Sequence, residues 1–542
     1  MEIKLLSASL PQRAFSAKQV LTHEAKVAAI KNIEMYALMK SAGQAVFHHM
    51  MKKYFKNETK NDLDKVSDTQ KLLVVCGKGN NGGDGFVIAR LAVQAGFQVS
   101  VLLTAKPEKL SGDALRAYQA YINAKKAENE LIIFDHKTAD VETVKNFQGK
   151  LIIDALFGIG FKGRLPDSLL TLVTSINQHM AKVISVDVPS GLCATTGVVD
   201  NTAIIANSTV TFIAIKTGLV TGQAINHVGQ VYFADLALGK IFTEQVSTNV
   251  TIYGNDIFTL LPKRKASSHK GNIGLLLAVG GGEGFAGAIR LSAEASLRSG
   301  AALVSVCCHK NNRTLVFNGR PEFMLAPCCA EQLAGSMTLN KAKAYVLGPG
   351  LGQSAWSKAL FDLVIAQKKL CVVDADGLRL LAKAYQQNLL TDKIKSNRWV
   401  LTPHPGEAAN LLNCTVKEIE RDRFSAVKKI AQQYQCVCLL KGAGSLISDG
   451  QQVWLNTTGN SGMASGGMGD VLSGIIAALI MQENSPENRE QQQVLTDFAK
   501  LTALAVYIHG KAADIIAQKH GKIGMLASDL LPIIRQLINK KF

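Results

Sequence analysis

Residues 72–90, LLVVCGKGNNGGDGFVIAR, place glycines and polar side chains between an apolar run and a helix-like run. Gly77, Gly79 and Gly82 form the pattern G-x-G-x-x-G, in which glycines allow backbone N–H groups at a helix start to approach an anion closely. Three glycines alone are weak evidence, because turns rich in Asn and Gly are common without any ligand. The neighbouring residues must decide between these alternatives.

The following strand-like run argues against an ordinary NAD site. A hydride-transferring Rossmann unit needs an acidic residue about 20 positions further on to hold the ribose hydroxyls. Here the run QVSVLL continues into TAK, and the first acid, Glu108, already lies in the next loop. Asn80, Asn81 and Asp84 add polar groups to the glycine turn that suit a sugar or a monovalent cation. The turn therefore predicts a dinucleotide site that differs from the hydride-transfer type.

Charged residues also end other strand-like runs of the first half, where parallel α/β sheets place their chemistry. Asp154 ends the run KLIID, and a glycine-rich loop with two cations follows at residues 158–164. Asp187 ends VISVD ahead of a Pro-Ser-Gly turn, and Lys216 ends TFIAIK. Each Asp alone could simply cap the following turn. Because several such ends converge in one sheet, they indicate a site.

The second half carries a separate group in NSGMASGGMGDVLSG, where Gly466, Gly467 and Gly469 precede Asp470 at the start of an apolar helix. Backbone N–H groups of such a turn can hold an anion. An Asp at this place can take a proton from a substrate hydroxyl while the turn holds a phosphoryl group. The alternative is that Asp470 only caps the helix. Capping requires no glycines upstream, so the pattern favours the catalytic interpretation.

The composition is that of a globular chain with more than one domain. Its 542 residues are 47% hydrophobic, which is sufficient for packed cores. The ten cysteines show neither C-x-x-C nor a metal-ligand spacing, so reduced thiols are expected in place of disulfides or zinc. The N-terminal apolar run is too short for a secretory signal, and the longest apolar stretch, VLSGIIAALIM, is too short to span a bilayer. We expect a cytoplasmic protein.

The formal net charge of +18 raises the question of a nucleic-acid partner. The basic residues are scattered along the chain, and aromatic residues make up only 6%, so no basic-aromatic stripe is formed. A basic surface that tolerates phosphorylated small molecules is the expected consequence. We therefore predict small-molecule substrates, no nucleic-acid or membrane partner, and a homo-oligomer.

Strand-like and helix-like runs alternate twice along the chain. KLLVVC, QVSVLL, KLIIDAL and VISVDV indicate a parallel sheet covered by helices on both faces, and residues 24–55 predict one or two amphipathic helices before it. After GQVYFADL the alternation restarts with NIGLLLAVGG and continues through ALVSVCC, LCVVDAD and CVCLLKGAG. The halves share no motif order or period. We expect two different α/β three-layer domains, at residues 1–244 and 245–542.

The first-half motifs CGKGNNGGDGFVIAR, IDALFGIGFKGRL, SVDVPSG and IKTG resemble those of the NAD(P)H-hydrate epimerase family. The resemblance implies a Rossmann-like domain that binds hydrated NADH or NADPH (NADHX, NADPHX) and equilibrates the two epimers at C6 of the nicotinamide ring. By position it implies Asp187 as the leading acid/base, Lys216 as a second catalytic candidate, and K⁺ ligands at Asn81, Asp154 and Ser190. Such oxygen ligands suit a hard cation. The residues implied to hold the hydrate are Asn80, Asn81, Gly82, Gly83, Asp84, Gly158, Ile159, Gly160, Phe161, Lys162, Gly163, Arg164 and Asp187.

One position departs from the epimerase pattern. The early helix reads LMKSAG, with Lys40 where the family pattern has an acid. The change affects a helix or subunit contact more directly than the chemistry. It also leaves open that the first half is a binding or scaffolding module, although Asn81, Asp154, Asp187 and Ser190 are all retained.

The second half contains, in order, SSHKGNIGLLLAVGGGEGFAGAIRLSAEASLRSGAALVSV, VLGPGLG, VVDADGL, LTPHPGEAANLL, LLKGAGS and GMASGGMGDVLSG. These motifs are similar to those of the ADP-dependent NAD(P)H-hydrate dehydratases of the ribokinase-like superfamily. The resemblance implies that Asp470 deprotonates the C6 hydroxyl of the S epimer, that ADP with Mg²⁺ phosphorylates it, and that loss of phosphate restores the ring. The residues implied for the hydrate pocket are Ala288, Gly350 or Gly352, His404 and Asp470, and those implied for the nucleotide are Lys441, Gly442, Ala443, Gly444, Ser445 and Gly469.

Two features of this assignment have alternatives. His404 lies between prolines and could be a packed loop histidine. A kinase of the hydroxymethylpyrimidine or hydroxyethylthiazole type would use the same GxGD pattern on an alcohol that stays phosphorylated. The fused first domain argues against such a kinase, because an epimerase supplies the dehydratase with the epimer that it otherwise cannot use.

Overall fold

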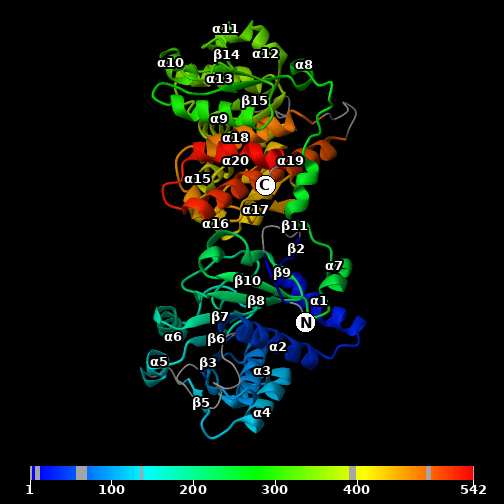
Figure 1. The fold of residues 1–542 in the computed structure, drawn as a ribbon, viewed down its shortest axis with the longest axis vertical. Helices are drawn as coiled ribbons and strands as arrows, with labels where there is room; N and C mark the ends of the chain where they lie inside the picture. Colours follow the sequence, from blue (N-terminus) through cyan, green and yellow to red (C-terminus); the bar gives the residue numbers. More distant parts are fainter. Residues whose placement is uncertain are drawn as a thin grey trace. The chain divides into compact units, whose positions relative to one another are not determined.

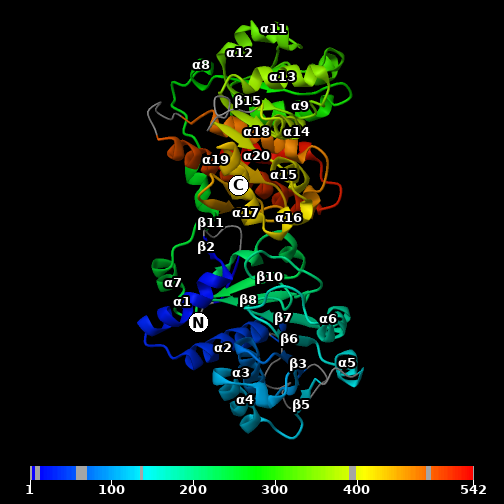
Figure 2. The same cartoon turned by 180° about the vertical axis from the view of Figure 1, so that it is seen from behind.

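The computed structural model describes residues 3–6, 12–55, 70–134, 138–389, 398–483 and 490–540; Figure 1 and Figure 2 show the chain from two opposite sides. The chain forms two compact units, of which the first ends at Thr248 and the second begins at Asn249. Within the described ranges, every helix is too short or too polar to traverse a lipid bilayer.

The first unit is built on one sheet whose strands follow the order β1-β10-β8-β7-β6-β3-β4-β5. All neighbouring pairs from β10 to β5 are parallel, and only β1 pairs antiparallel at the edge. The strands are β1 (Ile3–Leu5), β3 (Lys71–Cys76), β4 (Gln98–Leu103), β5 (Glu130–Ile133), β6 (Leu151–Ala155), β7 (Lys182–Val186), β8 (Ser208–Phe212) and β10 (Gln230–Ala234). A short parallel pair, β2 (Gln12–Phe15) with β9 (Ile215–Lys216), also belongs to this unit.

Helices cover both faces of this sheet, as the alternation of the sequence predicts. Along β3, the side chains of Leu72 and Val74 enter one hydrophobic cluster, whereas those of Leu73 and Val75 enter another. Successive side chains of a strand point to opposite faces, so two separate cores require two covering layers. The helices are α1 (Ala17–Ile30), α2 (Met35–Tyr54), α3 (Asn80–Gln94), α4 (Gly112–Ala124), α5 (Thr138–Lys145), α6 (Asp167–Gln178) and α7 (Gly239–Gln245).

The chain order within the sheet places the site. From β3 the chain continues to β4 and β5 on one side, and then returns to add β6 and β7 on the other side. Such a reversal between neighbouring strands opens a crevice at their carboxyl ends, where open α/β sheets bind ligands. The glycine turn after β3 and Asp154 on β6 lie at this reversal.

The second unit has its own sheet, with the order β14-β13-β12-β15-β16-β17-β18-β19-β20-β11. Its strands are β11 (Val250–Ile252), β12 (Leu275–Val279), β13 (Leu303–Cys307), β14 (Phe323–Leu325), β15 (Ala342–Leu347), β16 (Leu370–Val373), β17 (Trp399–Leu401), β18 (Val437–Leu440), β19 (Leu446–Ser448) and β20 (Val453–Leu455). The run from β14 to β18 is parallel, but β18, β19 and β20 pair antiparallel. The connections 441–445 and 449–452 are too short for the crossover that a parallel pair requires.

Two parallel helices form the centre of the second unit, α9 (Ala286–Arg298) and α18 (Met468–Ile480). Every residue of α18 from Val471 to Ile480 is buried, which is typical of a core helix that is apolar all round. Gly474 permits close approach, since a Cβ there would lie 2.1 Å from the carbonyl oxygen of Ser292. The other longer helices are α13 (Ala355–Ile365), α14 (Asp376–Gln386), α15 (Pro405–Leu412), α17 (Arg423–Tyr434), α19 (Gln491–His520) and α20 (Leu530–Ile538).

Candidate functional site

The glycines of the first turn bring the start of α3 against the end of β6. A Cβ at Gly77 would lie 2.0 Å from the carbonyl oxygen of Leu156, and a Cβ at Gly82 would lie 1.9 Å from that of Gly77. Both positions therefore require glycine for backbone approach. Gly79 is the N-cap of α3 and has open space around it, so its backbone faces the side from which a ligand can approach.

A buried cluster forms around Asp154 at the end of β6. Its carboxylate accepts hydrogen bonds from Ser185 Oγ at 2.7 Å and from Ser190 Oγ and N at 2.5 and 2.9 Å. Burial raises the pKa of Asp154, although the hydrogen bonds from Ser190 and Ser185 act in the opposite direction. The Ser190 hydroxyl also accepts a hydrogen bond from the backbone N–H of Phe157, at 2.9 Å. The structure thus brings together two of the three residues predicted to bind K⁺.

The third of these residues, Asn81, lies beside the same loop. Its Oδ1 would be 3.1 Å from a Cβ at Gly158, so this glycine keeps space free around the amide. Asn81 is buried, and its Nδ2 has no hydrogen-bond partner among the described residues. Turning the amide would exchange an unpartnered donor for an oxygen ligand. Amide, carboxylate and hydroxyl oxygens fit a hard monovalent cation. The described ranges contain no group of three His, Cys, Asp or Glu side chains placed to hold a metal ion.

Asp187, at the end of β7, is anchored to the neighbouring strand β8. Its φ of 63° is unusual for a residue with a side chain, and its N–H donates to Val210 O at 2.8 Å. Its Oδ1 accepts hydrogen bonds from Thr211 Oγ1 at 3.0 Å, Phe212 N at 3.3 Å and Lys216 Nζ at 2.5 Å. Such backbone conformations cost free energy and cluster at functional sites.

Lys216 uses its whole hydrogen-bonding capacity within this group. Besides Asp187 Oδ1, its ammonium donates to Thr211 Oγ1 at 3.1 Å and to Phe212 O at 2.9 Å. An ammonium has three N–H donors, so none remains for a ligand in this arrangement. Lys216 is buried beneath the carboxylate, where it compensates the charge of Asp187.

The carboxyl groups of Asp84 and Glu24 lie near Asp187, and the sequence predicts only Asp84 as a ligand contact. Burial, and then the charges of Asp187 and Glu24, raise the pKa of Asp84 well above its usual value. Burial also raises the pKa of Glu24. The charge of Lys216 acts to lower this pKa, and the charge of Asp187 acts to raise it. Glu24 comes from α1, and no spacing in the sequence connects it with the strand ends.

The loop after β6 is divided between core and solvent. Ile159 is buried in the core that Phe15 and Leu72 share, whereas Lys162 and Arg164 are exposed and present their cations to an approaching anion. Another predicted ligand contact, Gly83, is buried against α2, because a Cβ there would lie 2.6 Å from Met39 Cε.

Lys40, the departure from the epimerase pattern, lies on α2. Its ammonium is 5.3 Å from the centre of the Tyr36 ring, within the range of a cation–π contact. Tyr36 also receives the guanidinium of Arg116 at 4.2 Å. Lys40 thus packs on the outside of the helix layer, and none of its described contacts reaches Asp187.

In the second unit, the structure excludes the interpretation of Asp470 as a helix cap. The N-cap of α18 is Gly467, with a φ of 86°, and Asp470 lies within the first turn. Among the described residues, the hydrogen bond to Asp470 from a side chain goes to its backbone oxygen, which accepts from Ser473 Oγ at 2.8 Å, and none goes to its carboxylate. Burial, followed by the charge of Asp374, raises the pKa of Asp470 to about 7. Lys441 lowers this pKa without cancelling the effect.

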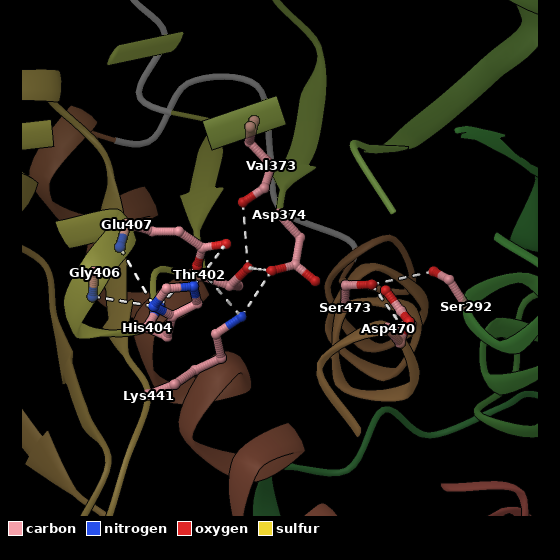
Figure 3. Close-up of polar contacts among 10 residues, drawn as sticks. All are labelled: Ser292, Val373, Asp374, Thr402, His404, Gly406, Glu407, Lys441, Asp470 and Ser473. Atoms are coloured by element: carbon pink, nitrogen blue, oxygen red, sulfur yellow. Dashed lines mark hydrogen bonds and ion pairs between the residues drawn. The ribbon is translucent and has the colours of Figure 1, made fainter. Parts of the chain in front are cut away.

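Lys441 is the centre of the polar network in Figure 3. Its Nζ donates to Asp374 Oδ1 at 2.9 Å and lies 3.8 Å from Glu407 Oε2, while Thr402 Oγ1 donates to the same Asp374 oxygen at 2.8 Å. Burial alone would lower the pKa of Lys441, but the charges of Asp374 and Glu407 outweigh it and raise the pKa. A Cβ at Gly469 would lie 3.4 Å from Lys441 Nζ, so the network borders the first turn of α18.

His404 is held by the start of α15, and Figure 3 shows its ring beside Glu407. Its Nδ1 accepts hydrogen bonds from the N–H groups of Gly406 and Glu407, at 3.0 and 3.4 Å. Glu407 reciprocates by accepting the N–H of His404 at 2.8 Å, which completes a capping box. The side chain is 52% exposed, so one edge of the ring stays open to a ligand.

The predicted hydrate-pocket residues of α9 and of the following strand ends lie together. A Cβ at Gly350 would be 3.1 Å from that of Ala288, and Gly352 N donates to Asp376 Oδ2 at 2.9 Å. The hydroxyls of Ser292 and Ser473 are 3.1 Å apart, so the parallel helices α9 and α18 begin side by side. Ala288 and Asp470 each lie about one turn before these serines, which puts them at the same edge of the unit.

The predicted nucleotide segment forms the open turn between β18 and β19. Gly442 and Gly444 have φ values of 138° and 62°, and Gly442 and Ala443 are exposed. The buried guanidinium of Arg423 supports the turn from below, because its Nη2 donates to Lys441 O at 3.1 Å. The turn therefore presents backbone groups to solvent next to Lys441.

Sequence reasoning missed Asp374, Glu407 and Thr211 as members of these sites. Asp374 directly follows β16, so the strand-end rule that identified Asp154 would have identified it too. Glu407 belongs to the pattern H-x-x-E of a capping box. Thr211 lies within a strand and carries no comparable signal.

Comparisons with known proteins agree with both units. The family described as NAD(P)H-hydrate dehydratase matches residues 276–536, and the family described as YjeF-related protein N-terminus matches residues 35–218. The chain is 39% identical to the bifunctional NAD(P)H-hydrate repair enzyme of Coxiella burnetii, over 95% of this chain and 97% of that protein. It is 38% identical to the enzyme of the same name from Escherichia coli, over 98% of this chain and 95% of that protein.

A similar solved structure is the ADP/ATP-dependent NAD(P)H-hydrate dehydratase of Bacillus subtilis, at 28% identity and a TM-score of 0.46, over 53% of this chain and 96% of that one. The two relatives, by contrast, are matched across both units. The chain therefore belongs to the family of bifunctional NAD(P)H-hydrate repair enzymes.

Proposed function

We propose that the chain repairs hydrated nicotinamide nucleotides in two steps. The first unit interconverts the R and S epimers of NADHX and NADPHX, and the second dehydrates the S epimer while ADP is converted to AMP and phosphate. One observation carries the proposal: a single chain holds two carboxylates in separate units, Asp187 at the end of β7 and Asp470 in the first turn of α18. We assign the epimerase to residues 1–244 and the dehydratase to residues 245–542.

In the dehydration, Asp470 acts as the general base. With a pKa of about 7 it is partly ionised at neutral pH, and its carboxylate is not occupied by other described hydrogen bonds. It accepts the proton of the C6 hydroxyl, whose oxygen then forms a bond to the terminal phosphorus of ADP as the bond to AMP breaks. The C6–O bond breaks next, phosphate leaves, and loss of the C5 proton restores the dihydropyridine ring.

The nucleotide is proposed to lie between the turn 441–445 and Gly469. The exposed backbone of the turn and the ammonium of Lys441 suit phosphate oxygens, and Gly469 leaves room beside that ammonium. Mg²⁺ would neutralise the charge of the transferred phosphoryl group. Asp374 fits a contact with it, because its Oδ1 is bound by Lys441 and Thr402 while its Oδ2 points toward Gly469.

In the epimerisation, Asp187 is proposed to take the proton of the C6 hydroxyl while the C6–N1 bond breaks and N1 gains a proton. When N1 gives up that proton and adds to the other face of the resulting aldehyde, Asp187 returns its proton to the oxygen. Lys216 holds one carboxylate oxygen, and the other remains for the hydrate. Asn81, Asp154 and Ser190 would hold K⁺ next to the glycine turn, where the ion would compensate the charge of a bound phosphate. Lys162 and Arg164 are the exposed cations of the adjacent loop.

We further propose a cytoplasmic location and a homo-oligomeric assembly. All ten cysteines are free in the structure, which suits a reducing compartment. The roles of Ala288, Gly350, Gly352 and His404 as hydrate contacts are part of the same proposal. The position of Gly350 beside Ala288, in the first turn of α9 next to α18, supports it.

A test of the function follows the recovery of NADH absorbance after a mixture of NADHX epimers is given to the full chain with ADP. Complete conversion is expected, because the R epimer is continually supplied to the second unit. A fragment beginning at residue 245 should convert only the S fraction and then stop, apart from the slow uncatalysed exchange. Conversion of the R epimer by this fragment at the rate of the full chain, or accumulation of a stable phosphorylated product, would contradict the proposal.

A further inference from the structure

The Asp187 carboxylate is bound asymmetrically. Three donors converge on Oδ1, namely Thr211 Oγ1, Phe212 N and Lys216 Nζ, at distances of 2.5–3.3 Å. No described residue donates a hydrogen bond to Oδ2. The carboxylate is therefore locked in one rotation, with a single oxygen left for the reaction.

Thr211 is the side chain that joins the two charged members of this group. It is fully buried on β8, its Oγ1 donates to Asp187 Oδ1 at 3.0 Å, and the same oxygen accepts from Lys216 Nζ at 3.1 Å. A hydroxyl has one proton and two acceptor sites, so these two contacts fix the direction of the proton. Thr211 thus supports the ammonium and the carboxylate at once.

The backbone of Asp187 depends on the same strand. Its N–H donates to Val210 O, and Phe212 N donates to its side chain, so consecutive residues of β8 hold the backbone and the carboxylate. With a φ of 63°, Asp187 is strained unless such contacts maintain it. A terminal carboxylate torsion is broad by itself, so the hydrogen bonds set its angle.

We propose that Thr211 is a positioning residue for the epimerisation, holding Asp187 Oδ1 so that Oδ2 alone faces the C6 hydroxyl. This inference rests on the proposed function of the first unit. Without the hydroxyl, Lys216 loses one acceptor, the carboxylate can rotate, and Oδ2 leaves the reactive orientation. Misplacement of a reacting group by about 1 Å can cost roughly 10²-fold in rate.

The same strand provides a matched control. Thr209 lies two residues before Thr211, so their side chains are on the same face of β8, and both are fully buried. The hydroxyl of Thr209 donates to Val228 O at 2.8 Å and makes no described contact with Asp187. Thr→Val at either position removes a buried hydroxyl at nearly constant volume, but only one of the two changes touches the carboxylate.

The experiment compares Thr211→Val, Thr211→Ser and Thr209→Val in the full chain. We expect Thr211→Val to lower kcat for conversion of R-NADHX roughly 10- to 100-fold with little change in KM, and Thr211→Ser to restore most of it. Thr209→Val should keep kcat near that of the unaltered chain. Dehydration of S-NADHX in the same molecules reports whether the second unit is intact. If Thr211→Val does not fold, Thr211→Cys, whose thiol is a weak donor, replaces it.

Each outcome decides the question. An unchanged kcat in Thr211→Val, an equal loss in Thr209→Val, or a failure of Thr211→Ser to restore activity would overturn the positioning role. An unaltered chain that cannot convert the R epimer would contradict the proposed function itself, which keeps the two failures apart.

Discussion

The two candidate bases, Asp187 and Asp470, differ in their relation to the nearest lysine. Lys216 lies 2.5 Å from Asp187 Oδ1 and has no other charged partner among its hydrogen bonds. Lys441 is instead bound to Asp374 at 2.9 Å and only influences Asp470 from a greater distance. Asp187 therefore forms an ion pair with Lys216, whereas the lysine nearest to Asp470 is already paired with Asp374.

This difference means that the surroundings of Asp187 mainly fix the orientation of its carboxylate, whereas the surroundings of Asp470 mainly change its pKa. Asp187 is held by hydrogen bonds to one oxygen, so its geometry is the feature that a substitution would disturb. Asp470 has no such restraint among the described residues, but burial and Asp374 raise its pKa to about 7, which suits a base that works near neutral pH. Substitutions that alter geometry and those that alter charge should therefore act differently in the two units.

The largest effect is expected for Asp470→Asn. Asn cannot accept the hydroxyl proton, so ADP-dependent dehydration of S-NADHX should fall roughly 10²–10⁴-fold. Interconversion of the epimers should continue at its normal rate, because Asp187 lies in the other unit. NADH absorbance measures the first reaction, and chromatographic separation of the epimers measures the second.

The control for this variant is Asp362→Asn, which removes an exposed carboxylate of α13 that is paired with Lys358. It should leave dehydration unchanged. Near-normal dehydration by Asp470→Asn would remove Asp470 from the mechanism and favour Asp374 as the acceptor of the proton.

A somewhat smaller effect is expected for Asp187→Asn, roughly 10²-fold on epimerisation with dehydration of the S epimer unchanged. The amide would retain hydrogen bonds from Thr211 and Phe212 but would lose the ion pair with Lys216. The rate of loss of the R epimer in the presence of ADP is the measurement. Asp167→Asn, at the exposed start of α6, is the matched control. Equal turnover of both epimers in Asp187→Asn would show that epimerisation does not need the Asp187 carboxylate.

The sequence predicts those site residues whose type and place along the chain follow a known pattern, such as an Asp at the end of a parallel strand. Asp154 and Asp187 were identifiable because the carboxyl end of a parallel strand faces the crevice of the sheet. The glycines of the first turn were identifiable as well, but two of them prove to be required by backbone packing, since a Cβ at Gly77 or Gly82 would collide with a carbonyl oxygen.

The remaining members of the sites depend on contacts that no local pattern encodes. Glu24 lies near the Asp187 group but comes from α1, which precedes the parallel strands, and Thr211 is one of two buried threonines on β8. The antiparallel arrangement of β18, β19 and β20 was missed for a different reason. β19 and β20 are three residues long each, so they do not stand out as apolar runs in the sequence.

The pH dependence of dehydration tests whether the charge of Asp374 raises the pKa of Asp470. Asp470 must be ionised to act as a base, so kcat/KM should fall about tenfold for each pH unit below 7. Asp374→Asn removes the largest charge that raises this pKa and should shift the midpoint of the fall to lower pH. Initial rates at saturating ADP, with activity regained after return to neutral pH, provide the measurement. A midpoint that stays unchanged in Asp374→Asn would show that burial alone sets the pKa.

The smallest effect concerns stability, and its sign distinguishes a buried base from a carboxylate that stabilises the start of α18. The pKa of Asp470 is about 7 in the folded chain and 3.8 in an unfolded one, so the folded chain binds more protons between these values. The free energy of unfolding therefore falls as pH rises through that interval, and the full penalty is present above pH 7. Each pKa unit corresponds to about 1.4 kcal/mol, which sets an upper limit of about 4 kcal/mol.

Asp470→Asn removes this penalty. We expect a net gain of about 1–2 kcal/mol for the second unit near pH 8, because relaxation around the carboxylate reduces the limit, and hence a Tm higher by about 2–6 °C. Near pH 5 the gain should be smaller, since Asp470 is then protonated in the folded chain. A carboxylate that only stabilises the helix start predicts the opposite sign, a loss of up to about 1 kcal/mol at either pH, because Asn lacks the negative charge that the helix dipole favours. Thermal unfolding of the variant at both pH values decides between them. A Tm that rises near pH 8 while dehydration is lost would mean that the chain gives up stability to keep an uncompensated base beside Lys441 and Asp374.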